Sequence, residues 1–421
     1  MIELVFDFPD LADFPVPAPP GAPTGPLSFT RPTRVLAAHE LSEVLPVLRA
    51  AERWALAGGW AAGFVAYEAA PAFDSALTVR TGAPGPLAWF GLFDRPAAIP
   101  RRSSGLGRLS ELAPDLTQTA HAAGIRAVRS ALGRGDAYQV NFTFRVEGLA
   151  TGDPLALYQQ LHAAQGARYG AFLRVDSRAI LSASPELFFL RRGDRISTRP
   201  MKGTARRCGH PEQDRQAARR LARSAKDRAE NVMIVDLLRS DLGRVARTGT
   251  VRVAQLCQVE PYPTVFQMTS SVEAQLRPST ALADVFAALF PCGSVTGAPK
   301  ASAMHLIAEV EASPRGAYCG AVGLVAPGGD ACFNVAIRTL DVDLENGRAV
   351  WGTGGGVTWG STAAGEWSEA LAKAAVLSAC TQGTGSRLSP PPAGASPRAR
   401  PAPSPGRPPG RPGRSGSAAA R

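Results

Sequence analysis

The chain reads GTGGGVTWGSTAAGEWSEALAKA over residues 352–374, a strand pattern that runs through glycines into a helix pattern. Three consecutive glycines from Gly354 onward would let a ligand approach the backbone N–H groups closely. The helix predicted over 366–380 places Glu366 and Glu369, three residues apart, on one face. A bend in a sheet followed by a solvated helix face would give the same letters, so the interpretation depends on the rest of the chain.

A second helix pattern, over 226–240, repeats the acid spacing with Asp227 and Glu230. Two helices that each offer two carboxylates could hold a hard cation such as Mg²⁺, which prefers oxygen ligands. Lys226 and Arg228 flank Asp227 and offer it local ion pairs. A solvated helix face is therefore the alternative here as well.

Three further segments carry groups that suit chemistry. SASPELFF (182–189) places Glu186 at the start of a β-type run, and RPMKGTARR (199–207) places Lys202 in a predicted loop. A lysine near other cations can have a depressed pKa and act as a nucleophile, although an ordinary exposed charge is the alternative for both residues. SVTGAPK (294–300) predicts a loop that opens a helix, whose free N–H groups could hold an anion.

Helix and strand patterns intermix from about residue 113 to 381 without a strict βαβ rhythm, which favours an α+β fold over a doubly wound sheet. Strands are predicted over 60–68, 138–147, 168–176, 179–190, 317–326, 332–342 and 349–359. Helices are predicted over 36–57, 118–134, 154–163, 211–222, 226–240, 279–289, 299–312 and 366–380.

The formal net charge of +11 is unevenly distributed. Residues 383–421 hold seven arginines and no acid, so +7 belongs to this segment and +4 to the rest of the chain. The segment is rich in Pro, Gly, Ser and Ala, and we expect it to be a disordered tail. Nucleic-acid binding through this basic tail is the alternative from a different class of function, and it predicts binding that weakens steeply with salt.

The six cysteines are scattered without a CxxC pair, and the five histidines show no paired spacing. These patterns predict reduced thiols in a cytoplasmic protein and argue against a soft-metal site. The N-terminus lacks the basic and apolar regions of a signal peptide, and no run of 18 apolar residues predicts a membrane span. We therefore expect neither a membrane nor, given the mild charge of the body, a nucleic acid as partner.

Taken in chain order, nine motifs resemble the chorismate-utilising enzyme family. They are DAYQVNFTFR (136–145), LSASPELFF (181–189), RPMKGTARR (199–207), AENVMIVDLLRSDLGRV (229–245), YPTVFQMTSSV (262–272), FPCGSVTGAPKASAM (290–304), RGAYCGAVG (315–323), FNVAIRTL (333–340) and GTGGGVTWGSTAAGEWSEALAKA (352–374). Each motif is weak alone, but together and in this order they are highly specific.

The resemblance implies one large α+β domain like that of anthranilate synthase component I, with two packed β-sheets surrounded by helices and an active site between them. It places this chorismate-binding catalytic domain at 113–382 and leaves 1–112 as an N-terminal part that packs on or contributes to it. It also implies that chorismate, a dicarboxylate, binds together with Mg²⁺.

The family's functional residues can be carried over to matching positions. By resemblance, Glu230 and Glu369 would ligate Mg²⁺ directly, with Asp227 and Glu366 behind them. Glu186 resembles the family's general acid, which protonates the leaving C4 hydroxyl. The residues that would hold a substrate carboxylate are Arg338, Tyr318, Lys373, Thr296, Gly355 and Gly356.

Two positions select a branch of the family. Isochorismate and salicylate synthases carry a water-activating Lys where this chain has Gln139, whose amide has no useful basicity. Lys202 resembles the aminodeoxychorismate synthases, whereas anthranilate synthases typically have Ala there. The resemblance then implies that Lys202 attacks C2 as the C4 hydroxyl leaves, and that ammonia displaces it at C4. Gln267 stands where many relatives have His, so that side chain cannot transfer a proton.

The chain shows no glutaminase signature, so we expect ammonia from a partner glutamine amidotransferase subunit in a heterodimer. The product implied is 4-amino-4-deoxychorismate, a precursor of p-aminobenzoate and folate. The runner-up is anthranilate synthase component I of tryptophan biosynthesis, which releases anthranilate directly. An isochorismate or salicylate synthase is a further alternative, and Gln139 argues against it.

Overall fold

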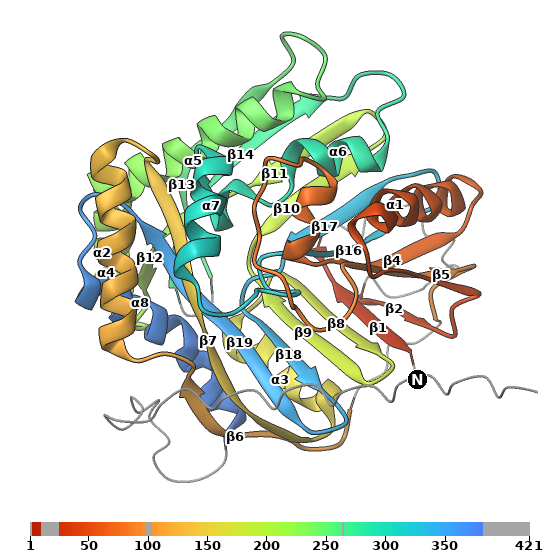
Figure 1. Ribbon diagram of the computed structural model, residues 1–421, viewed down its shortest axis with the longest axis horizontal. Helices are drawn as coiled ribbons and strands as arrows, with labels where there is room; N and C mark the ends of the chain where they lie inside the picture. The colour runs from red at the N-terminus through yellow and green to blue at the C-terminus, as the bar shows by residue number, and fades with distance from the viewer. Residues whose placement is uncertain (1, 10–24, 98–102, 263–264, 382–421) are drawn as a thin grey trace, which may run out of the picture. The chain divides into compact units, whose positions relative to one another are not determined.

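The computed structural model of the chain describes residues 2–9, 25–97, 103–262 and 265–381. The tail expected to be disordered, 383–421, lies outside these ranges, so that expectation stays a prediction. In the described residues, two large antiparallel sheets carry helices on their outer faces (Figure 1). The predicted α+β class is confirmed.

The strands of the first sheet are β1 (Glu3–Asp7), β2 (Leu27–Thr30), β6 (Gly107–Pro114), β7 (Gln139–Gly152), β8 (Tyr169–Val175), β9 (Arg178–Ser184), β15 (Gly297–Ala298), β18 (Thr339–Asp343) and β19 (Arg348–Val357). They follow the order β15–β7–β19–β18–β9–β8–β1–β2, with β6 also paired to β7.

The strands of the second sheet are β3 (Arg34–Ala38), β4 (Trp60–Val65), β5 (Ala88–Phe93), β10 (Leu187–Arg192), β11 (Arg195–Arg199), β12 (Met201–Arg206), β13 (Arg252–Pro261), β14 (Val265–Gln275), β16 (Ala321–Val325) and β17 (Ala331–Val335). Their order is β12–β14–β11–β10–β17–β16–β4–β5–β3, with β13 also paired to β14. Strands that precede residue 113 therefore take part in both sheets.

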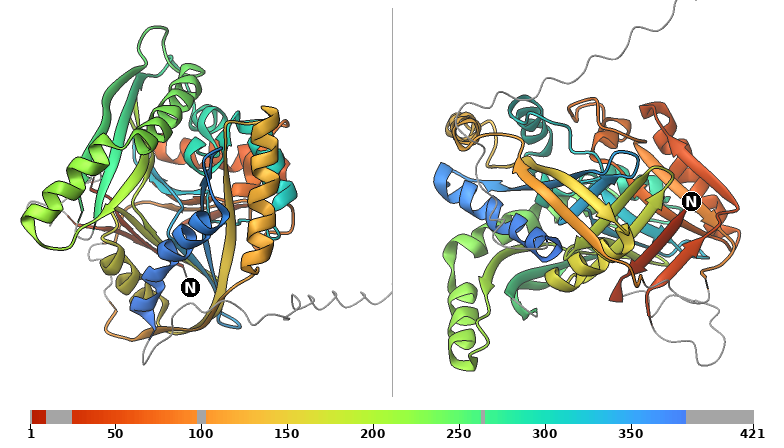
Figure 2. Two further views of the ribbon diagram at one scale, coloured as in Figure 1. Left: turned by 90° about the vertical axis from the view of Figure 1, so that its left-hand side faces the viewer. Right: turned by 90° about the horizontal axis from the view of Figure 1, so that it is seen from below.

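The α-helices are α1 (Leu41–Leu56), α2 (Gln118–Arg134), α3 (Pro154–Gln165), α4 (Pro211–Arg223), α5 (Ala225–Gly243), α6 (Leu282–Leu289), α7 (Lys300–Val310) and α8 (Ala363–Ala374). Short 3₁₀ helices are η2 (Tyr67–Ala72), η3 (Gly293–Val295) and η4 (Ala375–Cys380). Figure 2 shows α2 and α8 beside the first sheet and α4 and α5 beside the second.

Apolar side chains fill the space between the sheets. Leu173 and Ile180 of the first sheet pack in one cluster with Phe64 and Leu324 of the second. A second cluster joins the outer face of the second sheet to α1, α5 and α6, and a third joins the outer face of the first sheet to α3 and α8. Burial of both faces of each sheet explains why its strands read as nearly continuous apolar runs.

The chain crosses from one sheet to the other where single strands had been predicted. The prediction of one strand over 179–190 is wrong, because β9 belongs to the first sheet and β10 to the second. Pro185 lies at this crossing and has no N–H to continue the ladder. The prediction over 332–342 is wrong for the same reason, because β17 and β18 lie in different sheets.

The two crossings run side by side and bring two predicted site residues together. The N–H of Val335 donates to the carbonyl of Glu186 (3.0 Å), and the N–H of Ala183 donates to the carbonyl of Arg338 (3.0 Å). Arg338 adopts a φ of 51°, in the left-handed region that non-glycine residues rarely occupy. Glu186 and Arg338 therefore lie in the two connections where the chain passes from one sheet to the other.

Two further predictions need correction. The helix predicted over 36–57 is a strand, β3, followed by α1. The carboxylate of Glu43 accepts from the N–H groups of His39 (2.7 Å) and Glu40 (3.1 Å), which fixes the helix start later than predicted. The loop predicted over 199–207 is strand β12, paired to β14 with a bulge at Gly203, whose φ is 83°.

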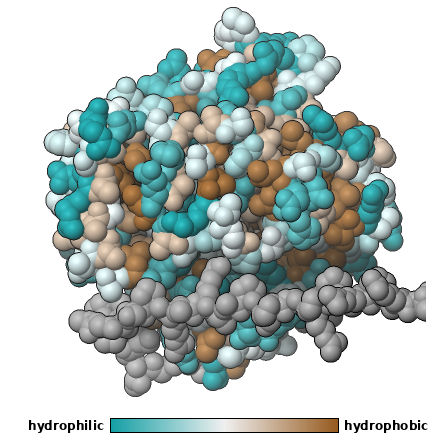
Figure 3. Space-filling view, viewed as in Figure 1, coloured by the Kyte–Doolittle hydropathy of each residue, from teal (hydrophilic) through white to brown (hydrophobic). Residues whose placement is uncertain are grey.

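No helix among the described residues is long and apolar enough to cross a membrane. On the face seen in Figure 3, hydrophilic residues are interspersed with hydrophobic ones.

Candidate active site

Glu186 and Lys202 meet at the loop that contains Ser294. The amine of Lys202 donates to the carbonyl of Ser294 (3.2 Å). Burial raises the pKa of the Glu186 carboxyl to about 7, although a hydrogen bond from Ser294 and the charge of Lys202 act in the opposite direction. Its Oε1 atom is buried and has no hydrogen-bond partner among the described residues. A carboxyl with this pKa can hold and release a proton near neutral pH.

The carboxylates of α8 converge on a glycine of β19. A methyl group added to Gly355 would lie 3.0 Å from Oε2 of Glu366, 3.5 Å from the amine of Lys373 and 3.6 Å from Oε1 of Glu369. The amine of Lys373 donates to Glu369 (2.7 Å) and to the carbonyl of Gly354 (2.8 Å). A side chain at position 355 would fill this space, which the glycine leaves open between β19 and the carboxylates of α8.

On α5, Glu230 experiences the charge of an acid on α8. Burial raises the pKa of Glu230, and the charges of Asp227 and Glu369 raise it further, while Lys202 and Lys226 act to lower it. The charge of Glu369 on α8 is thus among those that act on Glu230 of α5. Lys226 pairs with Glu230 (3.8 Å), not with Asp227 as the sequence had suggested. Asp227 lies instead against the bulge of β12, 2.8 Å from where a Cβ would stand on Gly203.

Arg338 lies at the end of α8, and Tyr318 lies against β19. The guanidinium of Arg338 donates to the carbonyl of Lys373 (2.7 Å) and to Gln165 (3.3 Å). Burial lowers the pKa of Arg338 to about 10, while Tyr318 and a carboxylate of α8 act to raise it. The ring of Tyr318 lies so close to Gly352 that any Cβ there would overlap it. Arg338 is thus held at the end of α8, and Tyr318 packs against β19.

Thr296 and Gly356 complete the set predicted from sequence. The hydroxyl of Thr296 is buried and donates to the carbonyl of Cys292 (3.1 Å), so its proton is already engaged. A Cβ on Gly356 would overlap the amide of Gln139, whose Oε1 is buried and has no partner in the described ranges. Gln139 therefore lines this part of the site with an oxygen that can accept a hydrogen bond.

Two residues discussed from the sequence have structural partners. The amine of Lys300 pairs with Asp241 (2.9 Å) and donates to the carbonyl of Leu289 (3.1 Å), so the predicted anion site lacks this charge. Gln267 donates to the carbonyl of Gly203 (3.0 Å) and accepts from Thr204 (3.0 Å), which supports the bulge of β12.

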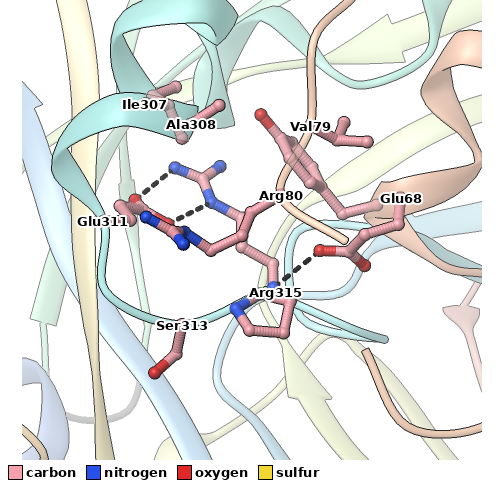
Figure 4. Close-up of a pocket in the computed structure, with 10 residues that line it drawn as sticks. Glu68, Val79, Arg80, Ile307, Ala308, Glu311, Ser313 and Arg315 are labelled. Carbon is pink, nitrogen blue, oxygen red and sulfur yellow. Dashed lines mark hydrogen bonds and ion pairs between the residues drawn. The ribbon is translucent and has the colours of Figure 1, made fainter. Parts of the chain in front are cut away.

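A buried polar network behind Tyr318 was not predicted. Glu68 of η2 accepts from the N–H groups of Arg315 (2.7 Å) and Gly316 (2.9 Å). Arg315 also pairs with Glu311 (2.7 Å), at the end of α7, and Figure 4 shows these side chains lining a pocket. The residues of this network lie far apart in the sequence, and no sequence motif predicted that they contact one another.

The acids fit a hard divalent cation by their donor chemistry. Glu230, Glu366 and Glu369 supply carboxylate oxygens, which Mg²⁺ prefers, and Gly355 keeps the space beside two of them open. In the parts of the chain that the structure describes, no three His, Cys, Asp or Glu side chains form a ready-made metal cluster. Lysines are instead paired with Glu230 and Glu369.

Comparison with known proteins identifies the family. A family model described as chorismate binding enzyme matches residues 97–379. Aminodeoxychorismate synthase component 1 of Escherichia coli (strain K12) is 42% identical over 264 residues, which are 63% of this chain and 58% of that protein. The protein of the same name from Klebsiella aerogenes is 45% identical over 249 residues, 59% of this chain and 54% of that protein. The matched region thus spans little more than half the length of these relatives.

The fold agrees with this match. The crystal structure of anthranilate synthase component I from Streptococcus pneumoniae TIGR4 superposes with a TM-score of 0.72 at 25% sequence identity, covering 83% of this chain and 90% of that one. Because the family model extends over well more than half of its residues, this chain belongs to the chorismate binding enzyme family.

Proposed function

We propose that this chain aminates chorismate at C4 to give 4-amino-4-deoxychorismate, with Mg²⁺ and with ammonia from a partner glutamine amidotransferase. Its similarity to proteins named aminodeoxychorismate synthase component 1 supports the reaction. The observation that carries the proposal is that Lys202 and Glu186, an amine and a carboxyl with a pKa of about 7, meet at Ser294.

The first step uses both groups. After its ammonium has given a proton to solvent, the amine of Lys202 forms a bond to C2 of the ring, and the two ring double bonds shift toward C4. The bond between C4 and its hydroxyl oxygen breaks, and the proton of Glu186 leaves with that oxygen as water. Glu186 suits this role because burial favours its protonated form.

The second step reverses the shift. Ammonia attacks C4, the double bonds return to their original positions, and the bond between C2 and the amine of Lys202 breaks. The attacking ammonia gives up one proton to become the amino group, and this proton replaces the one that Glu186 lost. The buried oxygen of Gln139 offers ammonia a hydrogen-bond acceptor but no base that would activate water.

The remaining residues hold the substrate. Arg338 can bind one carboxylate through a paired hydrogen-bond geometry, and Tyr318 and Lys373 stand beside it. Glu230 and Glu369 would hold Mg²⁺, with Asp227 and Glu366 behind them. The cation would supply positive charge for the other carboxylate of chorismate.

A product assay tests the reaction. Purified chain with chorismate, Mg²⁺ and ammonium at alkaline pH should give p-aminobenzoate only when an aminodeoxychorismate lyase is added. With glutamine in place of ammonium, product should require an added amidotransferase. Fluorescent anthranilate formed without the lyase would instead assign the chain to the anthranilate synthases.

Two variants test the role of Lys202. We expect Lys202→Ala and Lys202→Arg each to lower the rate by a factor on the order of 100 or more, because neither side chain can form the bond to C2. Arginine keeps the positive charge, so it separates a nucleophile from a counter-ion. Wild-type rates of product formation by either variant would rule out the covalent step.

A further inference from the structure

Lysine is rare in this chain, and its positions are not scattered. The sequence contains four lysines among 46 lysines and arginines, namely Lys202, Lys226, Lys300 and Lys373. Arginine therefore serves at nearly every position where a positive side chain occurs. A lysine offers a compact ammonium or a nucleophilic amine, which the planar guanidinium of arginine cannot replace.

Three of the four lysines face the acids of the candidate active site. Lys373 pairs with Glu369 (2.7 Å), and Lys226 pairs with Glu230 (3.8 Å). The charge of Lys202 acts on Glu186 and on Glu230. Two of these lysines have roles in the proposed function, whereas Lys226 has none.

The charge of Lys226 acts on acids of both α5 and α8. It lies in the first turn of α5, and its side chain remains 65% exposed. Burial raises the pKa of Glu366 on α8, and Lys226 is among the charges that act to lower it. Burial also acts to raise the pKa of Glu369, but Lys373, with smaller contributions from Lys226 and Lys202, lowers it overall. Lys226 is thus paired with Glu230 on its own helix, and its charge also acts on the two acids of α8.

Helix stability does not explain a cation at this position. A positive charge in the first turn is unfavourable because the N-terminus of a helix is itself positive. The pair with Glu230 also has the less favourable order, since glutamate stabilises a helix better when it precedes lysine by four residues. An exposed pair 3.8 Å apart contributes little to stability. The acids facing Lys226 are therefore the better reason for its presence.

We propose that Lys226 is a resident counter-ion that stays paired with Glu230 until Mg²⁺ binds, and that it sets the affinity for Mg²⁺ by competing with it for this carboxylate. The inference rests on the proposed Mg²⁺ site. The exposed, flexible side chain can swing into solvent when the divalent cation arrives. The lysine would keep the carboxylates from repelling one another in the meantime.

Calorimetric titration of the full chain with Mg²⁺ alone, without chorismate, tests the competition. We expect Lys226→Met to bind Mg²⁺ about fivefold more tightly than wild type, the size of one exposed charge interaction. Lys226→Arg keeps the charge and should stay within about twofold of wild type. Arg228→Met is the matched control, because it removes an exposed cation from the same turn of α5 that is not among the charges acting on these acids.

The outcomes separate this inference from the proposed function. Unchanged or weaker Mg²⁺ binding by Lys226→Met, with wild-type binding measurable, overturns the role of Lys226 alone. An equal gain in Arg228→Met overturns it too, because the effect would then be one of net charge. Absence of Mg²⁺ binding to folded wild-type chain overturns the metal site itself, and the inference with it.

Discussion

Burial makes the ionised form of Glu186 costly, and this cost suits the catalytic role that we propose for it. Its carboxyl is fully buried beside Ser294, and one oxygen lacks a partner among the described residues. The pKa is raised from 4.5 to about 7, so the folded protein binds a proton that the unfolded chain has already lost. The stabilisation that depends on the protonated Glu186 is therefore fully present below about pH 4.5. It is lost as the pH rises through about 7.

Replacing this residue should separate activity from stability. We expect Glu186→Gln to lower kcat by about 10²–10⁴-fold, because an amide cannot supply the proton. The same variant should be more stable than wild type at pH 8, by up to about 3 kcal/mol, and nearly equal to it at pH 4.5. Chemical denaturation at the two pH values measures the difference. A variant that is equally destabilised at both would show that Glu186 is a packing residue.

Single residues of the site were predictable where a local motif marks them. Glu186, Lys202 and the acid pairs stand in short segments that are weak signals alone, and they could be singled out because these segments occur together in one order. Ser294 and Glu68 were not predicted, because their roles depend on partners that the sequence does not reveal. Glu68 holds the backbone of Arg315, which is 247 positions away.

Among the elements, helices with local start signals were predicted well. The range predicted for α2 agrees with the structure, and the side chain of Thr117 caps it. Strands with irregular backbones were missed. In β13, Cys257 has a φ of 53° and the register against β14 shifts twice, so the sequence shows no clean alternation. The passages from one sheet to the other were not predicted, because the strands before and after each passage have the same apolar sequence pattern.

The packing of α2 against α8 contains a buried histidine. His121 lies between the rings of Phe142 and Trp367, each 5.2 Å away, and its Nδ1 has no partner among the described residues. Burial lowers its pKa from 6.5 to about 4. Between these values the unfolded chain binds a proton that the folded protein does not, so stability falls as the pH falls.

Replacing His121 by a residue that does not titrate should reduce the loss of unfolding free energy at acidic pH. We expect wild type to lose up to about 3 kcal/mol between pH 7 and 4 through His121. His121→Phe keeps the ring packing and should lose correspondingly less, as measured by urea denaturation at each pH. His305→Gln, at an exposed position on α7, is the control and should follow wild type. Identical pH profiles for wild type and His121→Phe would contradict this account.

At the scale of the whole molecule, the N-terminal part contributes strands to both sheets. β1 pairs with β8 of the first sheet, and β4 pairs with β16 of the second. Glu68 holds the turn that leads to Tyr318, a predicted substrate-binding residue. The sequence had left open whether residues 1–112 pack on the main domain or contribute to it, and these pairings favour a contribution.

A chain that begins at residue 113 should therefore fail to fold on its own. It would expose the edges of β8 and β16 and the apolar layer between the sheets. We expect no cooperative thermal transition by circular dichroism, while the full chain melts cooperatively. A cooperative transition in the shortened chain, with chorismate still bound, would show that the N-terminal part is an accessory.

The scarcity of lysine also makes the site chemically addressable. A reagent that acylates amines meets four side chains in the whole sequence, three of them around one group of acids. Lys226 is the most exposed of the paired lysines, while Lys300 is held in a mostly buried ion pair. A protease specific for lysine would release few, long peptides, and a single modified peptide would identify which amine had reacted. In this chain, a reagent that labels any amine would therefore report mainly on lysines of the candidate active site.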